Sequence, residues 1–211
     1  MDIVDLLVRV AGWSIQAVGW VWLGTAVWFA ARRAGSLWER VRHFLSTFLP
    51  EPGMIVGIVV LIVVVYALPR SLWEPVSWSS RVLIAVGSVL VVLSAALMVW
   101  ARLALGAMWA GRPLIQEEHE LRTDGPYRWV RHPIYTGILG TMIGLTLMVG
   151  FGAALVILVF VVGWLLWRVR VEDRMLIATF GRSYEEYRAA VPALVPQFRP
   201  LARQRVSPGG E

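Results

Sequence analysis

The chain has 211 residues, of which 58% are hydrophobic and only 16% charged, whereas a soluble domain is roughly half apolar and a quarter charged. Cysteine is absent, which excludes disulfides, cysteine-bound zinc, iron–sulfur clusters and thiolate nucleophiles; we assign no metal site. The net charge of +6 is typical of basic residues that flank membrane spans, so we expect no nucleic-acid partner.

Five apolar stretches are long enough to cross a hydrocarbon core as helices, which requires roughly 17 to 25 residues each. They lie near residues 11–31, 54–69, 82–101, 133–149 and 152–167. Only Gly150, Phe151 and Gly152 separate the last two, so we expect a tight helical hairpin there. The predicted fold class is therefore an all-α integral membrane protein with about five transmembrane helices.

The arginines are distributed unequally along these segments. All 20 basic residues are arginine, and 17 of them fall on one side of the predicted membrane and 3 on the other. The positive-inside rule then places the first loop, the loop over residues 102–132 and the C-terminal tail in the cytoplasm. The N-terminus is predicted to be outside.

Two capping-box patterns predict further helices outside the spans. Ser36-Leu37-Trp38-Glu39 predicts an interfacial helix over residues 36–49. Ser183-Tyr184-Glu185-Glu186 predicts a short helix that Pro192 ends, and we expect this tail to cover a site. We divide the chain into residues 1–100 with helices one to three, residues 101–200 with helices four and five and a C-terminal cap, and a flexible tail over 201–211.

The densest group of polar residues lies between the third and fourth predicted spans. Gly125-Pro126 predicts a turn, and Pro133 suits the first position of the fourth helix because its missing amide donor costs nothing there. That helix would begin beside His132, and its N-terminus could hold an anionic ligand group. Gly140 and Gly144 have the spacing of small residues at which helices pack closely.

The order and spacing of the polar residues resemble a known family. The chain contains His119-Glu120-Leu121, Gly125-Pro126-Tyr127, Arg131-His132-Pro133-Ile134-Tyr135-Thr136-Gly137, Glu172-Asp173-Arg174-Met175-Leu176, Phe180-Gly181, Tyr184 and Tyr187. This combination, over roughly residues 100–200, resembles the isoprenylcysteine carboxyl methyltransferase family and its short bacterial members, within the wider membrane methyltransferases that include phospholipid methyltransferases. The family commonly has two glutamates where this chain has Glu172 and Asp173, which leaves the role of the second acid open.

The resemblance implies S-adenosyl-L-methionine as the cofactor, bound on the cytoplasmic side of the membrane. It also implies methyl transfer to a lipophilic acceptor, either a small molecule or a lipidated molecule, foremost a carboxylate such as that of an isoprenylcysteine. We expect this acceptor to arrive from the lipids of a prokaryotic cytoplasmic membrane. The expected cofactor contacts are His119, Tyr127, Arg131, His132, Pro133, Tyr135, Gly137 and Glu172.

Arg168, Arg170 and Glu172 are the candidate catalytic residues, where the fifth helix leaves the membrane. Either arginine could orient an anionic acceptor, although both also fit as positive-inside anchors. A carboxylate acceptor would need no general base at neutral pH. An amine or thiol would need deprotonation, for which His119, His132 or Glu172 are available.

Two other functions fit the same pattern less closely. Sterol reductases resemble the same helical arrangement and use a nicotinamide cofactor, and a non-catalytic membrane partner could keep the fold without turnover. The oligomeric state is not predicted, because a glycine stripe serves contacts within and between chains equally well.

Overall fold

The structure is a computed structural model that describes residues 2–32, 52–106 and 121–196. These residues form six α-helices and three short 3-10 helices. The bounds are α1 Ile3–Arg32, α3 Pro52–Ala67, η1 Arg70–Leu72, η2 Glu74–Val76, α4 Arg81–Leu105, η4 Gly125–Arg128, α5 Pro133–Val149, α6 Ala154–Phe180 and α7 Arg182–Ala190. The predicted interfacial helix over 36–49, His119 and the tail over 201–211 lie outside the described residues.

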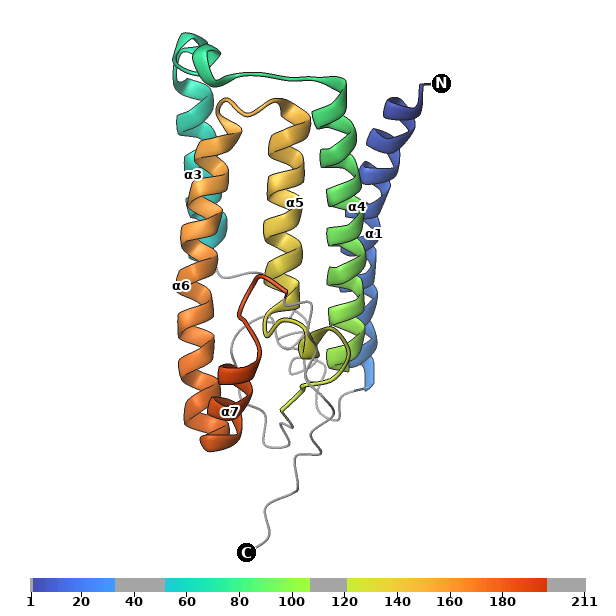
Figure 1. Ribbon diagram of the computed structural model, residues 1–211, viewed down its shortest axis with the longest axis vertical. Coiled ribbons are helices and arrows are strands. Elements are labelled where there is room, and N and C mark those ends of the chain that lie inside the picture. Colours follow the sequence, from blue (N-terminus) through green and yellow to red (C-terminus); the bar gives the residue numbers. More distant parts are fainter. Residues whose placement is uncertain (1, 33–51, 107–120, 197–211) are drawn as a thin grey trace, which may run out of the picture.

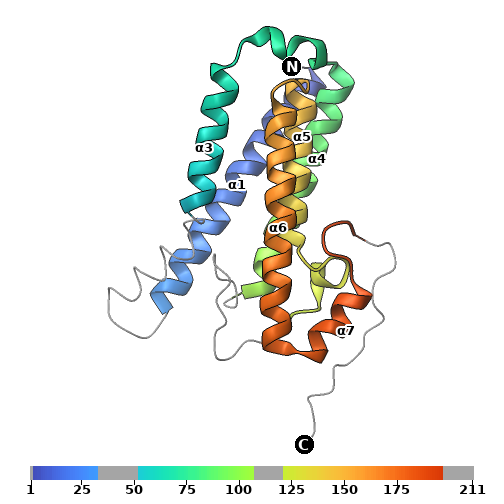
Figure 2. The same ribbon diagram turned by 90° about the vertical axis from the view of Figure 1, so that its left-hand side faces the viewer.

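The long helices run side by side as a bundle (Figures 1 and 2). α4 packs against α1 and α5, α5 packs against α6, and α6 also contacts α3 and α7. The beginning of α1, the α3–α4 connection and the α5–α6 turn lie at one end, which we call the turn end (Figure 1). η4, the C-terminal part of α6 and α7 lie at the other end, which we call the polar end (Figure 1).

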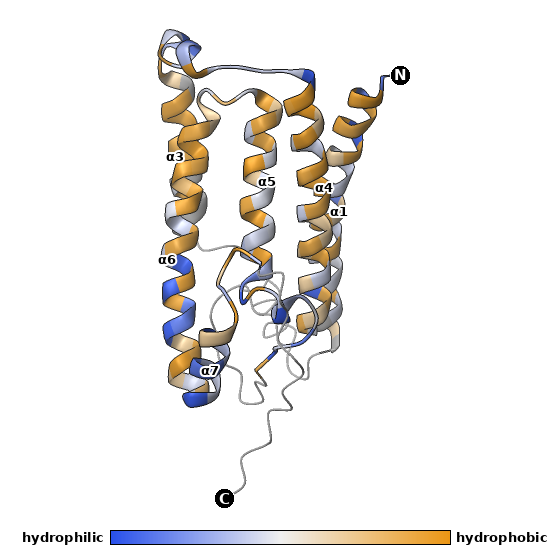
Figure 3. Ribbon diagram, viewed as in Figure 1, coloured by the Kyte–Doolittle hydropathy of each residue, from blue (hydrophilic) through white to orange (hydrophobic). Residues whose placement is uncertain are grey.

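Three of the described helices are long and apolar enough to cross a membrane: α1 over Ile3–Trp28, α4 and α6. α5 is also apolar but has only 17 residues. Figure 3 shows apolar residues along most of the bundle and hydrophilic residues gathered on α7 and the neighbouring part of α6. The all-α integral membrane class is therefore confirmed, whereas the count of five spans and the outside N-terminus stay predictions.

α6 is much longer than the apolar stretch that predicted it. The stretch ends at residue 167, but the helix continues through Arg168 and Asp173 to Phe180 and ends at Gly181, which has a φ of 52°. Charged residues end the hydrophobic pattern without breaking the backbone hydrogen bonds of a helix, whereas a glycine with a positive φ readily ends the helix itself. Residue 167 is therefore the end of the predicted membrane-spanning stretch and not the end of the helix.

Close packing of α4 against α5 depends on glycine. A Cβ atom added at Gly144 would lie 2.7 Å from the carbonyl oxygen of Gly87, and one added at Gly87 would lie 2.5 Å from that of Gly144. Gly140 faces the Ser94 side chain in the same way. The predicted packing role of Gly140 and Gly144 is confirmed.

The predicted helical hairpin between α5 and α6 is also confirmed. Gly150, Phe151 and Gly152 all have positive φ angles, of 85°, 64° and 52°. The amide of Trp78 donates to the Gly150 carbonyl over 2.9 Å, and the amide of Gly152 donates to the Val76 carbonyl over 3.2 Å. The hairpin is thereby fastened to the α3–α4 connection at the turn end.

Candidate active site

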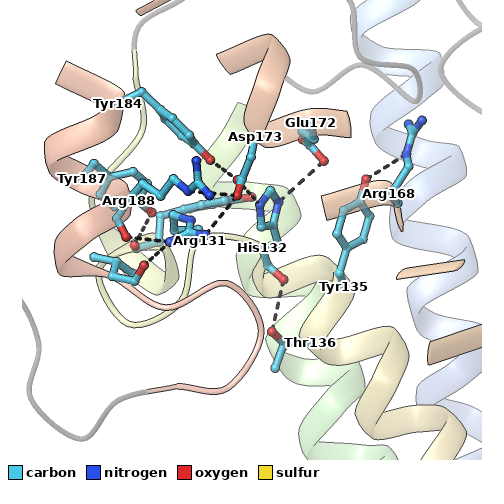
Figure 4. A network of polar contacts seen from close by, with 12 residues as sticks. Arg131, His132, Tyr135, Thr136, Arg168, Glu172, Asp173, Tyr184, Tyr187 and Arg188 are labelled. Atoms are coloured by element: carbon cyan, nitrogen blue, oxygen red, sulfur yellow. Dashed lines mark hydrogen bonds and ion pairs between the residues drawn. The ribbon is translucent and has the colours of Figure 1, made fainter. Parts of the chain in front are cut away.

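The polar end of the bundle brings together side chains from α5, α6, α7 and the loop before α5 (Figure 4). His132 is the residue before α5, and Pro133 occupies the first position of the helix, as predicted. Both residues are buried. The rigid start of α5 therefore fixes the histidine ring in place.

The ring of His132 lies between two carboxylates. Its Nε2 atom is 3.0 Å from Oδ1 of Asp173, and its Nδ1 atom is 3.6 Å from Oε2 of Glu172. Glu172 and Asp173, which are consecutive residues of α6, therefore contact the two nitrogens of the histidine ring.

Asp173 is the centre of the polar network in Figure 4. Besides His132, its carboxylate accepts hydrogen bonds from the Tyr184 hydroxyl at 2.5 Å and from Nη2 of Arg131 at 3.1 Å. Nε of Arg188 lies 3.7 Å away as a further ion-pair partner. A carboxylate that is only 5% exposed requires such partners, because an unpaired buried charge is costly. Asp173 thus joins the start of α5 to α6 and α7.

Arg131 fastens the C-terminal segment to the loop before α5. Its Nη1 atom donates to the carbonyls of Val191 at 2.5 Å and Arg188 at 2.8 Å. Its backbone amide donates to Pro192 over 2.9 Å. Arg131 thus holds the segment after α7 beside the site, and its predicted contact with the cofactor stays a prediction.

The predicted short helix after α6 is present as α7. Tyr184, Tyr187 and Val191 form a buried apolar cluster against the end of α6, and the Tyr187 hydroxyl donates to the Tyr127 carbonyl over 2.6 Å. Burial and the hydrogen bond to Asp173 raise the pKa of Tyr184 far above its ordinary value, so this hydroxyl remains a donor. α7 closes one side of the polar end.

The predicted capping box of α7 was wrong. The helix begins at Arg182 after Gly181, so Ser183 lies inside its first turn, and no side chain caps it. Arg182 instead pairs with Glu186 one turn along, at 2.9 Å. Gly181 occupies the N-cap position and has no side chain, so it cannot cap the helix as a serine would.

A second part of the site lies on the other side of His132. The rings of His132 and Tyr135 are stacked, with centroids 5.5 Å apart, and Trp164 approaches Tyr135 edge-on at 6.4 Å. Nε of Arg168, whose side chain is buried, donates to the Tyr135 hydroxyl over 3.2 Å. A cation and aromatic rings thus lie together between the polar end and the apolar part of the bundle.

The structure separates the two arginines that were predicted as catalytic. Residues two apart on a helix differ by about 200° around its axis. Arg168 is buried toward α5, whereas Arg170 is exposed on the opposite face of α6. Of the two, Arg168 is therefore the one beside His132 and Tyr135.

Two of the predicted cofactor residues pack against α4. A Cβ atom at Gly137 would lie 2.9 Å from the Ser94 carbonyl oxygen and 2.3 Å from Cγ of Met98. Tyr127 is 7% exposed and its hydroxyl faces the Ala101 carbonyl at 3.5 Å. Both residues shape the wall behind the site, and their cofactor contact stays a prediction.

Asp173 and Tyr184 belong to the polar network. The sequence analysis left the role of Asp173 open and placed Tyr184 only in the short helix expected to cover the site. Both are part of the family pattern, but only the fold shows that a residue of α7 meets one of α6 beside His132. The available signal in the sequence was that Asp173 is an acidic residue directly after Glu172, a candidate site residue.

Glu172 has unused hydrogen-bonding capacity. Its Oε2 atom is buried and has Nδ1 of His132 as an ion-pair partner at 3.6 Å, which is beyond hydrogen-bond distance, and it accepts no hydrogen bond from the described residues although a third of the side chain is exposed. A buried acceptor without a donor is costly unless a ligand supplies one. The site can therefore receive a donor group such as an ammonium or a sugar hydroxyl.

Comparisons with known proteins point to one family. Residues 83–178 match the model described as the isoprenylcysteine carboxyl methyltransferase (ICMT) family. The protein-S-isoprenylcysteine O-methyltransferase of Schizosaccharomyces pombe is 36% identical over 81 residues, which are 38% of this chain and 34% of that protein. The methanethiol S-methyltransferase of Mycobacterium tuberculosis is 32% identical over 91 residues, which are 42% of this chain and 34% of that protein.

A solved structure shares the fold. The eukaryotic intramembrane Ras methyltransferase ICMT matches with a TM-score of 0.55 at 19% identity, over 75% of this chain and 63% of that one. The aligned segment spans about a third of the two curated relatives. The predicted resemblance is confirmed, since residues 83–178 carry the pattern of the isoprenylcysteine carboxyl methyltransferase family on a related helical membrane fold.

Proposed function

We propose that this chain is a membrane methyltransferase that uses S-adenosyl-L-methionine and acts on a lipophilic acceptor. The observation that carries the proposal is the His132 ring between Glu172 and Asp173 at the polar end. These residues lie within the segment that matches the family model.

The residues present fit the proposed cofactor. S-adenosyl-L-methionine, when bound, supplies a methyl group activated by its sulfonium charge. Oε2 of Glu172 offers a buried acceptor for an ammonium or ribose hydroxyl, and the stacked rings of His132 and Tyr135 offer an aromatic wall. Carboxylates and aromatic faces both favour a cationic ligand. We assign His132, Tyr135 and Glu172 to cofactor binding.

Asp173 acts in this proposal as a positioning residue. It holds His132 through Nε2 and holds α7 through Tyr184. The Asp173 carboxylate both orients His132 and holds α7. The proposed site is therefore complete only when α7 packs against α6. Transfer of an activated methyl group depends chiefly on such positioning and on the exclusion of water.

Arg168 is the residue we assign to the acceptor. Its side chain is buried beside Tyr135, close to Trp164 and the apolar part of the bundle. A guanidinium there can orient a carboxylate whose hydrophobic portion stays in the membrane. We therefore propose an acceptor carboxylate like that of an isoprenylcysteine, with the methyl group passing to a carboxylate oxygen.

The direction of the site follows from the arginine distribution. The polar end carries the segments that the positive-inside rule assigns to the cytoplasm. We propose that the site opens to the cytoplasm of a prokaryotic cell, where the cofactor enters from water and the acceptor from the bilayer.

A methyl-transfer assay tests the proposal. The full chain in proteoliposomes would receive S-adenosyl-L-methionine with a tritiated methyl group and one of three acceptors: N-acetyl-S-farnesylcysteine, its methyl ester, or a long-chain thiol. We expect label in the free acid and none in the ester. Label in the thiol alone would overturn the carboxylate assignment, and no label in any acceptor, despite cofactor binding, would overturn the acceptor class.

A further inference from the structure

One face of α6 is exposed from Val159 onward and changes from apolar to basic near the polar end. Its exposed residues recur at helical spacing, with Val159, Gly163, Leu166 and Trp167 followed by Arg170 and Arg174. No described atom lies within 4 Å of a Cβ placed at Gly163. An exposed apolar stripe on a membrane helix faces acyl chains.

The arginines of this stripe line a cavity between α6 and α7. Its volume is about 250 Å³, and Arg170, Asp173, Arg174 and Arg188 line it. Three cations and one carboxylate make the lining strongly positive. The Asp173 carboxylate is shared among Arg131, His132, Tyr184 and Arg188, so it offsets only part of the positive charge of the cavity.

Arg170 and Arg174 are free to bind a ligand. Neither forms an ion pair within the described part of the chain, and both side chains are exposed. Arg188 reaches the cavity from α7, and its side chain is 51% exposed although Nε lies near Asp173. The cavity thus combines hydrogen-bond donors from α6 and α7, which lie side by side when α7 packs against α6.

The position along α6 matches the headgroup layer. Arg170 lies three residues beyond Trp167, a rise of about 4.5 Å, and Arg174 lies one turn further. Trp167 is 48% exposed, and exposed tryptophans typically mark the boundary between acyl chains and headgroups. Arg170 and Arg174 therefore lie at the level of the phosphate groups of a bilayer.

This cavity is distinct from the candidate active site. Arg168 and Glu172 lie on the opposite side of α6, where they contact Tyr135 and His132, whereas Asp173 and its ion-pair partner Arg188 border both regions. A ligand in the cavity would not touch the groups that we assign to the cofactor or acceptor. The inference therefore goes beyond the proposed function and does not depend on it.

We propose that the cavity between α6 and α7 binds the phosphate of an anionic phospholipid, with an acyl chain along the exposed stripe of α6. Arg170, Arg174 and Arg188 contact the phosphodiester, and Val159, Leu166 and Trp167 contact the chain. The lipid contacts α6 and α7 together, so its binding supports the docked position of α7.

Native mass spectrometry of the full chain in detergent tests this site. The protein would be mixed with equal amounts of palmitoyl-oleoyl phosphatidylglycerol and phosphatidylcholine, as wild type, Arg170→Gln and Arg174→Gln. Arg182→Gln is the matched control, because it removes one charge from α7 at a side chain that is 91% exposed and does not line the cavity.

We expect the wild type to retain more phosphatidylglycerol than phosphatidylcholine. In each cavity variant the affinity for phosphatidylglycerol should be about fivefold lower, as expected for the loss of one arginine near a lipid phosphate. Arg182→Gln should retain the wild-type affinity. Equal retention of both lipids, or an equal loss in Arg182→Gln, would overturn the proposal. Displacement of the lipid by millimolar inorganic phosphate would show a free-anion site and overturn the lipid assignment.

Discussion

The α4–α5 interface and the network around Asp173 are both buried, but they are held together by different forces. Gly87 and Gly144 bring two backbones into contact, and van der Waals packing stabilises that interface. Around Asp173 the contacts are hydrogen bonds and ion pairs between side chains of α6, α7 and the loop before α5. One interface positions helices, and the other positions chemical groups.

This difference predicts two kinds of mutant. A change between α4 and α5 should lower the stability of the bundle and affect ligand binding only through unfolding. A change in the network should undock α7 and disorganise His132 while the membrane helices remain folded. The following variants test that division.

Asp173→Asn should have the largest effect. Removing one partner from a buried charge network costs about 3–5 kcal/mol, and here it leaves Arg131 and Arg188 without their carboxylate. We expect faster proteolysis of the segment after residue 180 and a large loss of S-adenosylhomocysteine affinity. Asp124→Asn, at an exposed side chain, is the control, and similar behaviour of the two variants would contradict the role of Asp173.

Tyr184→Phe should give a smaller effect of the same kind. It removes one hydroxyl that donates to Asp173 and leaves the ring packed. A hydrogen bond to a charged group contributes about 1.5–3 kcal/mol. Proteolysis of α7 should accelerate less than in Asp173→Asn. In the double variant the two effects should be far from additive, and full additivity would separate Tyr184 from the network.

Gly144→Ala tests the other interface. Its added methyl group would overlap the Gly87 carbonyl and the Val91 side chain, and overpacking costs about 1–3 kcal/mol. Unfolding in mixed SDS micelles should show lower stability, whereas the affinity of folded protein for S-adenosylhomocysteine should be unchanged. Gly163→Ala, which meets no described atom, should be nearly neutral, and equal destabilisation by both would contradict the packing argument.

Arg168→Gln should show the most selective effect. Loss of one charge-assisted contact to a carboxylate acceptor should raise KM by about tenfold, with little change in S-adenosylhomocysteine affinity. Arg182→Gln controls for the loss of one positive charge. A large fall in cofactor affinity in Arg168→Gln would instead place this arginine in the cofactor site.

Much of the fold was predictable because membrane helices follow hydropathy and glycine marks their turns. The hairpin at Gly150–Gly152 and the start of α5 at Pro133 were predicted correctly. The end of α6 was left without a prediction, because hydropathy detects the edge of the bilayer and a helix can continue beyond it.

The candidate site was predictable as a set of residues but not as an arrangement. His132, Tyr135 and Glu172 come together as predicted, and Arg168 joins them. Arg170 was grouped with Arg168 by its position in the sequence, yet helical rotation places it on the opposite face. The role of Asp173 in holding α7 depends on its hydrogen bond with Tyr184. The turn at Gly181 brings Tyr184 back to Asp173, and the sequence did not predict this contact.

Calorimetric binding of S-adenosylhomocysteine to the detergent-purified chain tests the central claim most directly. His132→Ala and Glu172→Ala would be compared with the wild type and with Arg182→Gln, all checked for intact folding by circular dichroism. We predict saturable binding by the wild type and by Arg182→Gln, and clearly weaker binding by His132→Ala and Glu172→Ala. Absence of binding by the well-folded wild type, or undiminished binding by both site variants, would contradict the account.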